Sequence, residues 1–333
     1  MKNHRKPIRF MTIVIILLIS HSALATAQVT YRQAINDPMG SQQSKVLEMH
    51  DVYSFYGTDI YPPSIIRMLN LGAAKMTGYE DVQKAWASII SKDDVVALKF
   101  NDCGVSAFSW NYEFLDLLLQ NFYQLGYKKE NFMIIGIHNL PNSAIGTRIR
   151  HYGWEADATF IGSDLDYLPL WLNQVTAIIN IPNFMDDNII GIRGCLANLS
   201  WSMVKQPARF YQNKDDNGDP YIADINILPA IHDKVRLHIV NALQVLYYGG
   251  PHYDTTYQVN HQSILMSFDP VALDHIGIEY LRKYRKTKTM PQILPPKLYS
   301  QYLITAELYG LGYYNFTDIA YEKINPNLYV DQY

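Results

Sequence analysis

Ionisable and amide side chains that could bind a ligand lie where predicted strands end. Lys99 and Asn101 close an apolar run, and Asp187 follows the apolar run of a later strand. A lysine at the carboxyl edge of a sheet can meet an anionic ligand, or it can pair with a carboxylate such as Asp269 or Asp274. Lys99 and Asp274 are therefore candidate catalytic residues, and Lys99 and Asn101 are candidate ligand-binding residues. A buried ion pair between Lys99 and one aspartate, fixing the sheet edge, is the equally weighted alternative.

A glycine-rich turn that opens a predicted helix supplies a second group of candidates. Gly191, Arg193 and Gly194 form this turn, and Asn198 lies in the helix, which is predicted to run to about Val204. Backbone N–H groups at a helix start, together with the Arg193 guanidinium, could hold a carboxylate or phosphate. Gly191, Arg193, Gly194 and Asn198 are thus predicted ligand-binding residues. A tight turn with an exposed arginine is the alternative.

Three histidines follow predicted strands or their turns and could gather at one metal site, namely His50, His138 and His252. None shows the close pairing of a zinc helix or finger, and ordinary polar packing explains most single histidines. Asp269 precedes Pro270 at a predicted helix start, where it is expected to be the N-cap.

Two cysteines, Cys103 and Cys195, limit the cofactor chemistry. Iron–sulfur clusters usually need four thiolates, so no such cluster is expected. Both cysteines lie just past predicted strands. They could form a disulfide in an oxidising compartment, or they could be two buried thiols.

Short apolar runs alternate with amphipathic stretches, which is typical of parallel strands joined by helices. The sequence therefore predicts an α/β domain over residues 28–290, with a mostly parallel sheet flanked by helices. Residues 291–333 form a tyrosine-rich helix and coil extension that packs on it. Strands are predicted at 45–49, 95–100, 132–137, 158–161, 177–181, 237–246 and 263–268, and helices at 64–76, 81–90, 112–125, 228–234 and 270–284.

The first 27 residues have the layout of a cleaved secretory signal: basic residues, the apolar run 10–19, and Ala25-Thr-Ala27. Ten apolar residues are too few to span a membrane, so a periplasmic or secreted chain is expected. Cleavage would remove four basic and no acidic side chains, leaving 24 Lys and Arg against 31 Asp and Glu, a net charge of −7. An acidic chain without a basic stripe argues against nucleic acid as a partner.

The chain resembles the bacterial family known as domain of unknown function 362 from about Lys45 to Arg285. The resemblance rests on the segments Lys99-Phe-Asn101, 178–199, Gly249-Gly-Pro251 and Asp269-Pro-Val-Ala-Leu-Asp274. The family motif commonly places a lysine, a histidine and a second lysine where this chain has Met185, Asp187 and Ala197. The resemblance implies a binding fold whose chemistry has been lost or changed, and it makes Asp187 a third candidate catalytic residue.

Three functions are compatible with these residues. The first is binding of a small anionic ligand or cofactor at the carboxyl ends of the strands. The second is a metal- or cofactor-dependent enzyme of the oxidoreductase or isomerase type. The third is an accessory subunit that uses its tyrosine-rich end to bind a protein partner in an extracytoplasmic assembly.

Overall fold

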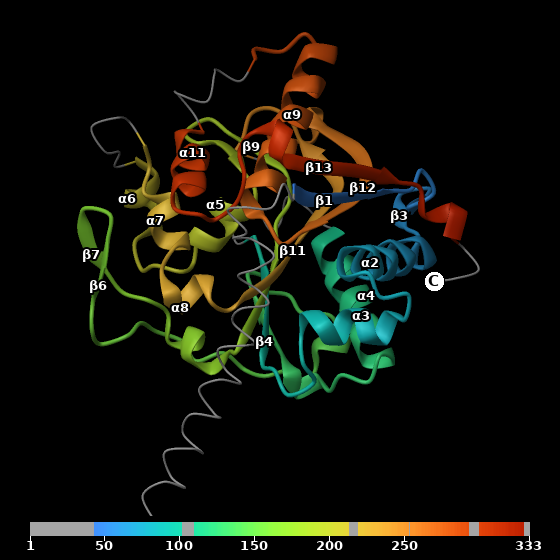
Figure 1. The fold of residues 1–333 in the computed structure, drawn as a ribbon, viewed down its shortest axis with the longest axis horizontal. Coiled ribbons are helices and arrows are strands. Elements are labelled where there is room, and N and C mark those ends of the chain that lie inside the picture. The colour runs from blue at the N-terminus through green and yellow to red at the C-terminus, as the bar shows by residue number, and fades with distance from the viewer. Residues whose placement is uncertain (1–42, 102–109, 213–218, 253, 293–299, 330–333) are drawn as a thin grey trace, which may run out of the picture. The chain divides into compact units, whose positions relative to one another are not determined.

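A mixed, mostly parallel sheet organises the part of the chain that the structure describes (Figure 1). The structure is a computed structural model that describes residues 43–101, 110–212, 219–252, 254–292 and 300–329. The path through the sheet is β13-β1-β12-β11-β8-β4-β5, and the short strands β9 and β10 join it beside β11. The strands are β1 (Ser44–His50), β4 (Val96–Phe100), β5 (Phe132–Ile135), β8 (Ala177–Ile181), β9 (Met185–Asp187), β10 (Gly191–Arg193), β11 (Val235–Leu246), β12 (Gln258–Ser267) and β13 (Ile319–Ile324).

Strand direction changes within the sheet. Strands β5, β4, β8 and β11 run parallel, whereas β12 pairs antiparallel with both β11 and β1. Every residue of β4 and β8 is buried. This explains their continuous apolar sequences, because a parallel strand covered on both faces cannot alternate apolar with polar residues.

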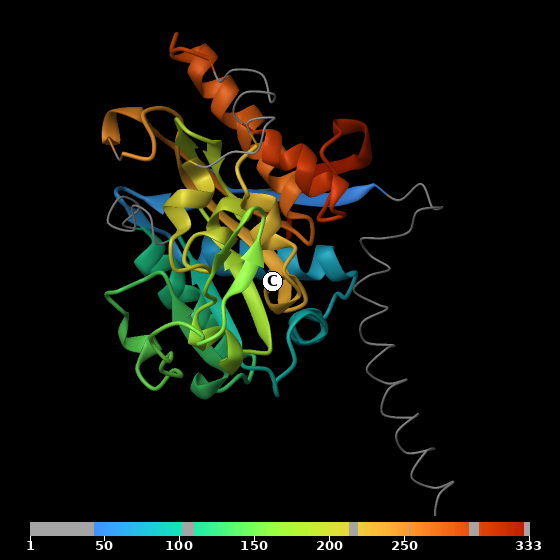
Figure 2. The same cartoon turned by 90° about the vertical axis from the view of Figure 1, so that its left-hand side faces the viewer.

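Helices cover the two faces of the sheet through separate apolar clusters (Figures 1 and 2). On one face lie α2 (Pro62–Thr77), α3 (Val82–Ile89) and α4 (Trp110–Gln124). On the other face lie α5 (Cys195–Ser200), α6 (Pro207–Gln212), α7 (Ile222–Asn226), α8 (Pro229–His232), α9 (Pro270–Thr287) and α11 (Gln301–Leu308). Among the described residues, no helix is long and apolar enough to cross a membrane.

The α/β class and most predicted elements are confirmed, but the segment at 158–161 does not continue the sheet. Its strand β6 (Thr159–Ile161) pairs only with β7 (Asp164–Asp166) in a separate hairpin. Gly162 between them has a φ of 57°, a left-handed conformation that lets the chain reverse directly after β6. Local pairing therefore replaces pairing with the central sheet. A second hairpin, β2 (Phe55–Tyr56) with β3 (Asp59–Ile60), is also separate from it.

Two further predictions need correction. Gly191 does not lie in the turn at the helix start. It belongs to β10, which pairs antiparallel with β9, and the helix that follows ends at Ser200 rather than near Val204. The helix stops there because Trp201 is extended and Ser202 has a φ of 70°.

The C-terminal extension is more than helix and coil. Its strand β13 pairs in parallel with β1 and forms one edge of the sheet. The two strands are separated by more than 260 residues, and local periodicity carries no information about such distant pairing.

Candidate functional site

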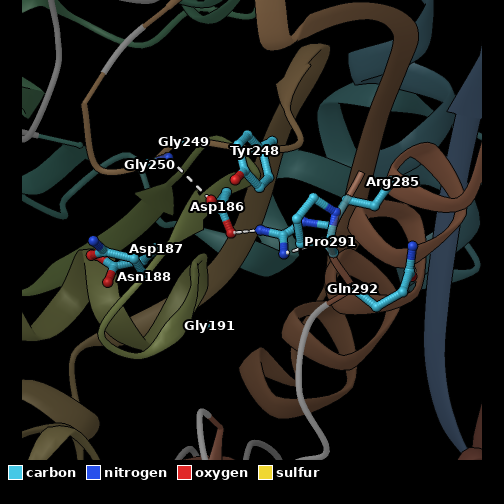
Figure 3. Close-up of a pocket in the computed structure, with 10 residues that line it drawn as sticks. All are labelled: Asp186, Asp187, Asn188, Gly191, Tyr248, Gly249, Gly250, Arg285, Pro291 and Gln292. Carbon is cyan, nitrogen blue, oxygen red and sulfur yellow. Dashed lines mark hydrogen bonds and ion pairs between the residues drawn. The ribbon is translucent and has the colours of Figure 1, made fainter. Parts of the chain in front are cut away.

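A pocket with a volume of about 310 Å³ lies beyond the carboxyl ends of β8 and β11. Strand β9, which follows β8 along the chain, runs parallel to the end of β11 through the pair Leu246 and Met185. Figure 3 shows the lining residues, which come from the β9–β10 hairpin, the segment after β11, the end of α9 and the segment after α9. They are Asp186, Asp187, Asn188, Gly191, Tyr248, Gly249, Gly250, Arg285, Pro291 and Gln292.

Asp186 and Arg285 form a buried ion pair in this pocket. The other oxygen of Asp186, Oδ2, accepts the backbone N–H of Gly250 at 3.1 Å. Arg285 also donates from Nε to the Tyr247 carbonyl at 2.8 Å and from Nη1 to the Pro291 carbonyl at 3.2 Å. Burial raises the pKa of Asp186 to about 6, although the adjacent Arg285 guanidinium acts to lower it.

Gly250 allows the chain to approach Asp186 closely. A Cβ atom on Gly250 would lie 1.6 Å from the carbonyl oxygen of Asp186, so only glycine fits without moving the backbone. The ring of Tyr248 completes this side of the pocket, with the Arg285 guanidinium 5.2 Å from its centroid. The sequence prediction missed Asp186, Tyr248 and Arg285. The available signals were the Gly249-Gly-Pro251 segment and the two adjacent aspartates at the end of a buried run.

Asp187 and Arg193 form a second buried pair, which joins the two strands of the β9–β10 hairpin. Asp187 Oδ2 accepts from Arg193 Nε at 2.5 Å, and Asp187 Oδ1 accepts the N–H groups of Ile189 and Ile190. The Arg193 guanidinium also stacks on Trp201, with 4.8 Å to the ring centroid. Arg193 is 6% exposed, so the alternative of an exposed arginine is wrong.

The start of α5 was predicted to bind the carboxylate of a ligand. In the structure it binds the carboxyl group of Asp274, which belongs to the chain itself. Asp274 accepts the N–H of Cys195 at 2.5 Å and the N–H of Leu196 at 3.0 Å. A Cβ atom on Gly194 would lie 2.1 Å from Asp274 Oδ1, which explains the glycine. Burial raises the pKa of Asp274 to about 7, against the lowering effect of these two N–H donors.

Lys99 and Asn198 come together, as the strand-edge prediction requires, but in a packed polar network. Lys99 Nζ donates to the Phe100 carbonyl at 2.7 Å and to Asn198 Oδ1 at 3.2 Å. Asn198 Nδ2 donates to the Lys99 carbonyl and to Asn180 Oδ1. Asn101 is also buried. The pocket at Asp186 is lined by none of the polar residues of this network, which are Lys99, Asn101, Asn180 and Asn198.

The carboxylates proposed to pair with Lys99 bind backbone N–H groups. Asp269 accepts from Ala272 at 2.8 Å, which confirms it as the N-cap of α9, and from Tyr313 at 2.8 Å. Asp274 binds the start of α5. The catalytic roles considered for Lys99, Asp187 and Asp274 stay predictions.

The histidines considered for a metal site are dispersed. His50 lies at the end of β1 and bonds to Ser263, whereas His138 and His252 are exposed. Strand β1, which ends at His50, and strand β5, which precedes His138, are five positions apart in the sheet, so with strands about 4.8 Å apart these two strands are roughly 24 Å apart. Within the described part of the chain, no three His, Cys, Asp or Glu side chains are close enough to hold a metal ion.

Cys195 is a buried free thiol, and burial raises its pKa. Cys103, the other cysteine, lies outside the described residues, and the free thiol of Cys195 agrees with the alternative of unpaired thiols rather than with a disulfide.

Residues 161–279 match the family described as Domain of unknown function (DUF362). This segment belongs to the DUF362 family. No curated protein matches the chain. The DUF362 segment is shorter than the resemblance from Lys45 to Arg285 and contains β8 to β12 with most of α9. It therefore supplies Asp186 but not Arg285.

The DUF362 segment also contains Met185, Asp187 and Ala197, where the resemblance implies a lysine, a histidine and a lysine. Met185 and Ala197 are buried in apolar clusters. Asp187 instead carries the ion pair with Arg193. Met185 and Ala197 thus pack in the core, whereas Asp187 joins the two strands of the hairpin beside the pocket.

Proposed function

We propose that this protein binds a small anionic ligand in the pocket beyond β8 and β11, and that Arg285 receives the negative charge. The observation that carries this proposal is the guanidinium of Arg285 in the pocket lining, held beside the Tyr248 ring by backbone carbonyls. Arginine is well suited to oxyanions because its planar donors match two oxygen atoms at once.

The rest of the lining supports a small, oriented ligand. Asn188 and Gln292 offer amide groups, and the Tyr248 ring offers an aromatic face. The pocket lies at strand ends, the common position of ligand sites in α/β proteins. Charged and amide side chains make up half of the ten lining residues, and such polar groups can fix the orientation of a ligand.

The experiment is a calorimetric titration of the protein with methanesulfonate and with inorganic phosphate. We expect Arg285→Lys to weaken binding by about tenfold or more, because lysine keeps the charge but loses the planar donor pair. Arg282→Lys, on the same helix but outside the lining, is the matched control. If both variants bind as the wild type does, or if neither anion binds to the wild type, the proposal is wrong.

We also propose that the chain is exported and acts in the periplasm or outside the cell. The basic residues, apolar run and Ala25-Thr-Ala27 of the first 27 residues support this proposal.

A further inference from the structure

Charges around the pocket are balanced in pairs. Asp186 pairs with Arg285 and Asp187 pairs with Arg193, and each of these four side chains is less than a tenth exposed. An anion that entered the pocket would leave one negative charge without a counterpart. Such a charge is costly away from water unless it is paired or neutralised.

Asp186 is the group best placed to remove that excess charge. It faces Arg285 from α9, the N–H groups of Gly249 and Gly250 from the segment after β11, and Asp187 from its own strand. Asp187 is itself neutralised by Arg193 of β10. Once an external anion takes the guanidinium of Arg285, burial and the neighbouring Asp187 both favour the neutral form of Asp186.

We propose that the pocket takes up its anion together with one proton. The ligand oxyanion binds the guanidinium of Arg285, and Asp186 becomes a carboxylic acid whose O–H can donate to the same oxyanion. The proton comes from solvent, so the total charge of the pocket is the same before and after binding. This inference rests on the proposed function and adds its coupling to pH.

The direction of the pH dependence follows from the free protein. With Arg285 in place, the pKa of Asp186 is about 6. Above about pH 6 the free carboxylate is ionised, so each bound anion must bring a proton and the affinity falls about tenfold per pH unit. Below about pH 6 Asp186 already carries its proton, and the affinity becomes independent of pH.

The test is calorimetric titration with methanesulfonate, a monoanion that does not titrate in the range used. At about pH 8, the binding enthalpy is measured in two buffers with different ionisation enthalpies. The difference between the two binding enthalpies should correspond to the uptake of about one proton per bound anion. Affinity measured from about pH 5 to 8 should fall above pH 6. Asp186→Asn should bind without proton uptake and with a flat pH profile.

Controls separate proton uptake by Asp186 from proton uptake by other groups. His252→Gln removes an exposed histidine near the pocket in sequence and should leave the proton uptake unchanged. The number of protons taken up by the wild type can be measured even if Asp186→Asn fails to fold, so the test does not depend on this variant. Binding at Arg285 without proton uptake overturns the coupling but leaves the proposed function intact. Absence of methanesulfonate binding at about pH 5, where Asp186 is neutral, overturns the coupling, and absence of both methanesulfonate and phosphate binding there also overturns the proposed function.

Discussion

At the scale of single residues, groups that were candidates for binding an external anion contact side chains or carbonyl groups of the protein itself. The helix start at Cys195 binds the carboxylate of Asp274, and Arg193 binds Asp187. Lys99 donates to Asn198 and to a carbonyl group. Two of the groups predicted to bind an anion, the helix start at Cys195 and Arg193, thus contact a carboxyl group of the chain itself. What the sequence did not reveal is that Asp274 and Asp187 are the anions that two of these groups bind.

Asp274→Asn tests the internal carboxylate. At pH 5 the protonated carboxyl of Asp274 still places an oxygen at each of the two N–H groups, whereas the amide places an oxygen at only one, so we expect the free energy of unfolding to fall by about 2 kcal/mol. Folding raises the pKa of Asp274 from 3.8 to about 7, so the folded state binds its proton more tightly. Protonation of Asp274 thus makes its full contribution to the free energy of unfolding below about pH 4, and this contribution is lost as the pH rises to about 7. Asp274→Asn lacks this pH dependence.

Urea unfolding at several pH values measures this effect, with the exposed Asp93→Asn as control. A stability difference between wild type and Asp274→Asn that stays constant from pH 4 to 8 would show that Asp274 does not titrate as expected.

At the scale of elements, the C-terminal extension is part of the sheet. Strand β13 brings Tyr321 and Lys323 to the fully buried Glu48 of β1, where Tyr321 donates at 2.5 Å and Lys323 lies 2.7 Å away. Tyr280 of α9 donates to the same carboxylate. Burial raises the pKa of Glu48, but these partners and the charge of His261 outweigh it and lower the pKa to about 2. Removing β13 would therefore expose a sheet edge and leave a buried carboxylate with fewer partners.

A chain ending at Asp318 should be destabilised by about 3 kcal/mol or more relative to a chain ending at Tyr329, which keeps β13. Loss of partners around a buried charge and loss of an edge strand both act in this direction. Circular dichroism during urea unfolding gives the comparison. Equal midpoints for the two chains would mean that the extension is dispensable, as a separate partner-binding tail would be.

At the scale of the whole molecule, the DUF362 segment cannot complete its own sheet. Strands β1, β4, β5 and β13 lie outside residues 161–279. Without β4, the buried strand β8 would present an unpaired edge. Arg285 also lies outside the segment, so both the sheet and the pocket need residues on either side of it.

The proposed export concerns the whole chain. Expressed with its first 27 residues, the protein should be recovered outside the cytoplasm with Gln28 as its first residue. Intact mass of the protein from each cell fraction measures this. A chain that keeps residues 1–27 and stays in the cytoplasm would contradict the proposal.

The sequence by itself determined the α/β class, most strand positions and the N-cap at Asp269. These follow from local signals: continuous apolar runs, amphipathic spacing, and glycine and proline at turns. Tertiary structure alone decided which charges meet, because Asp186 and Arg285 are 99 residues apart. It also decided that β13 joins β1 and that β6 leaves the sheet, since strand pairing depends on partners that no local pattern specifies.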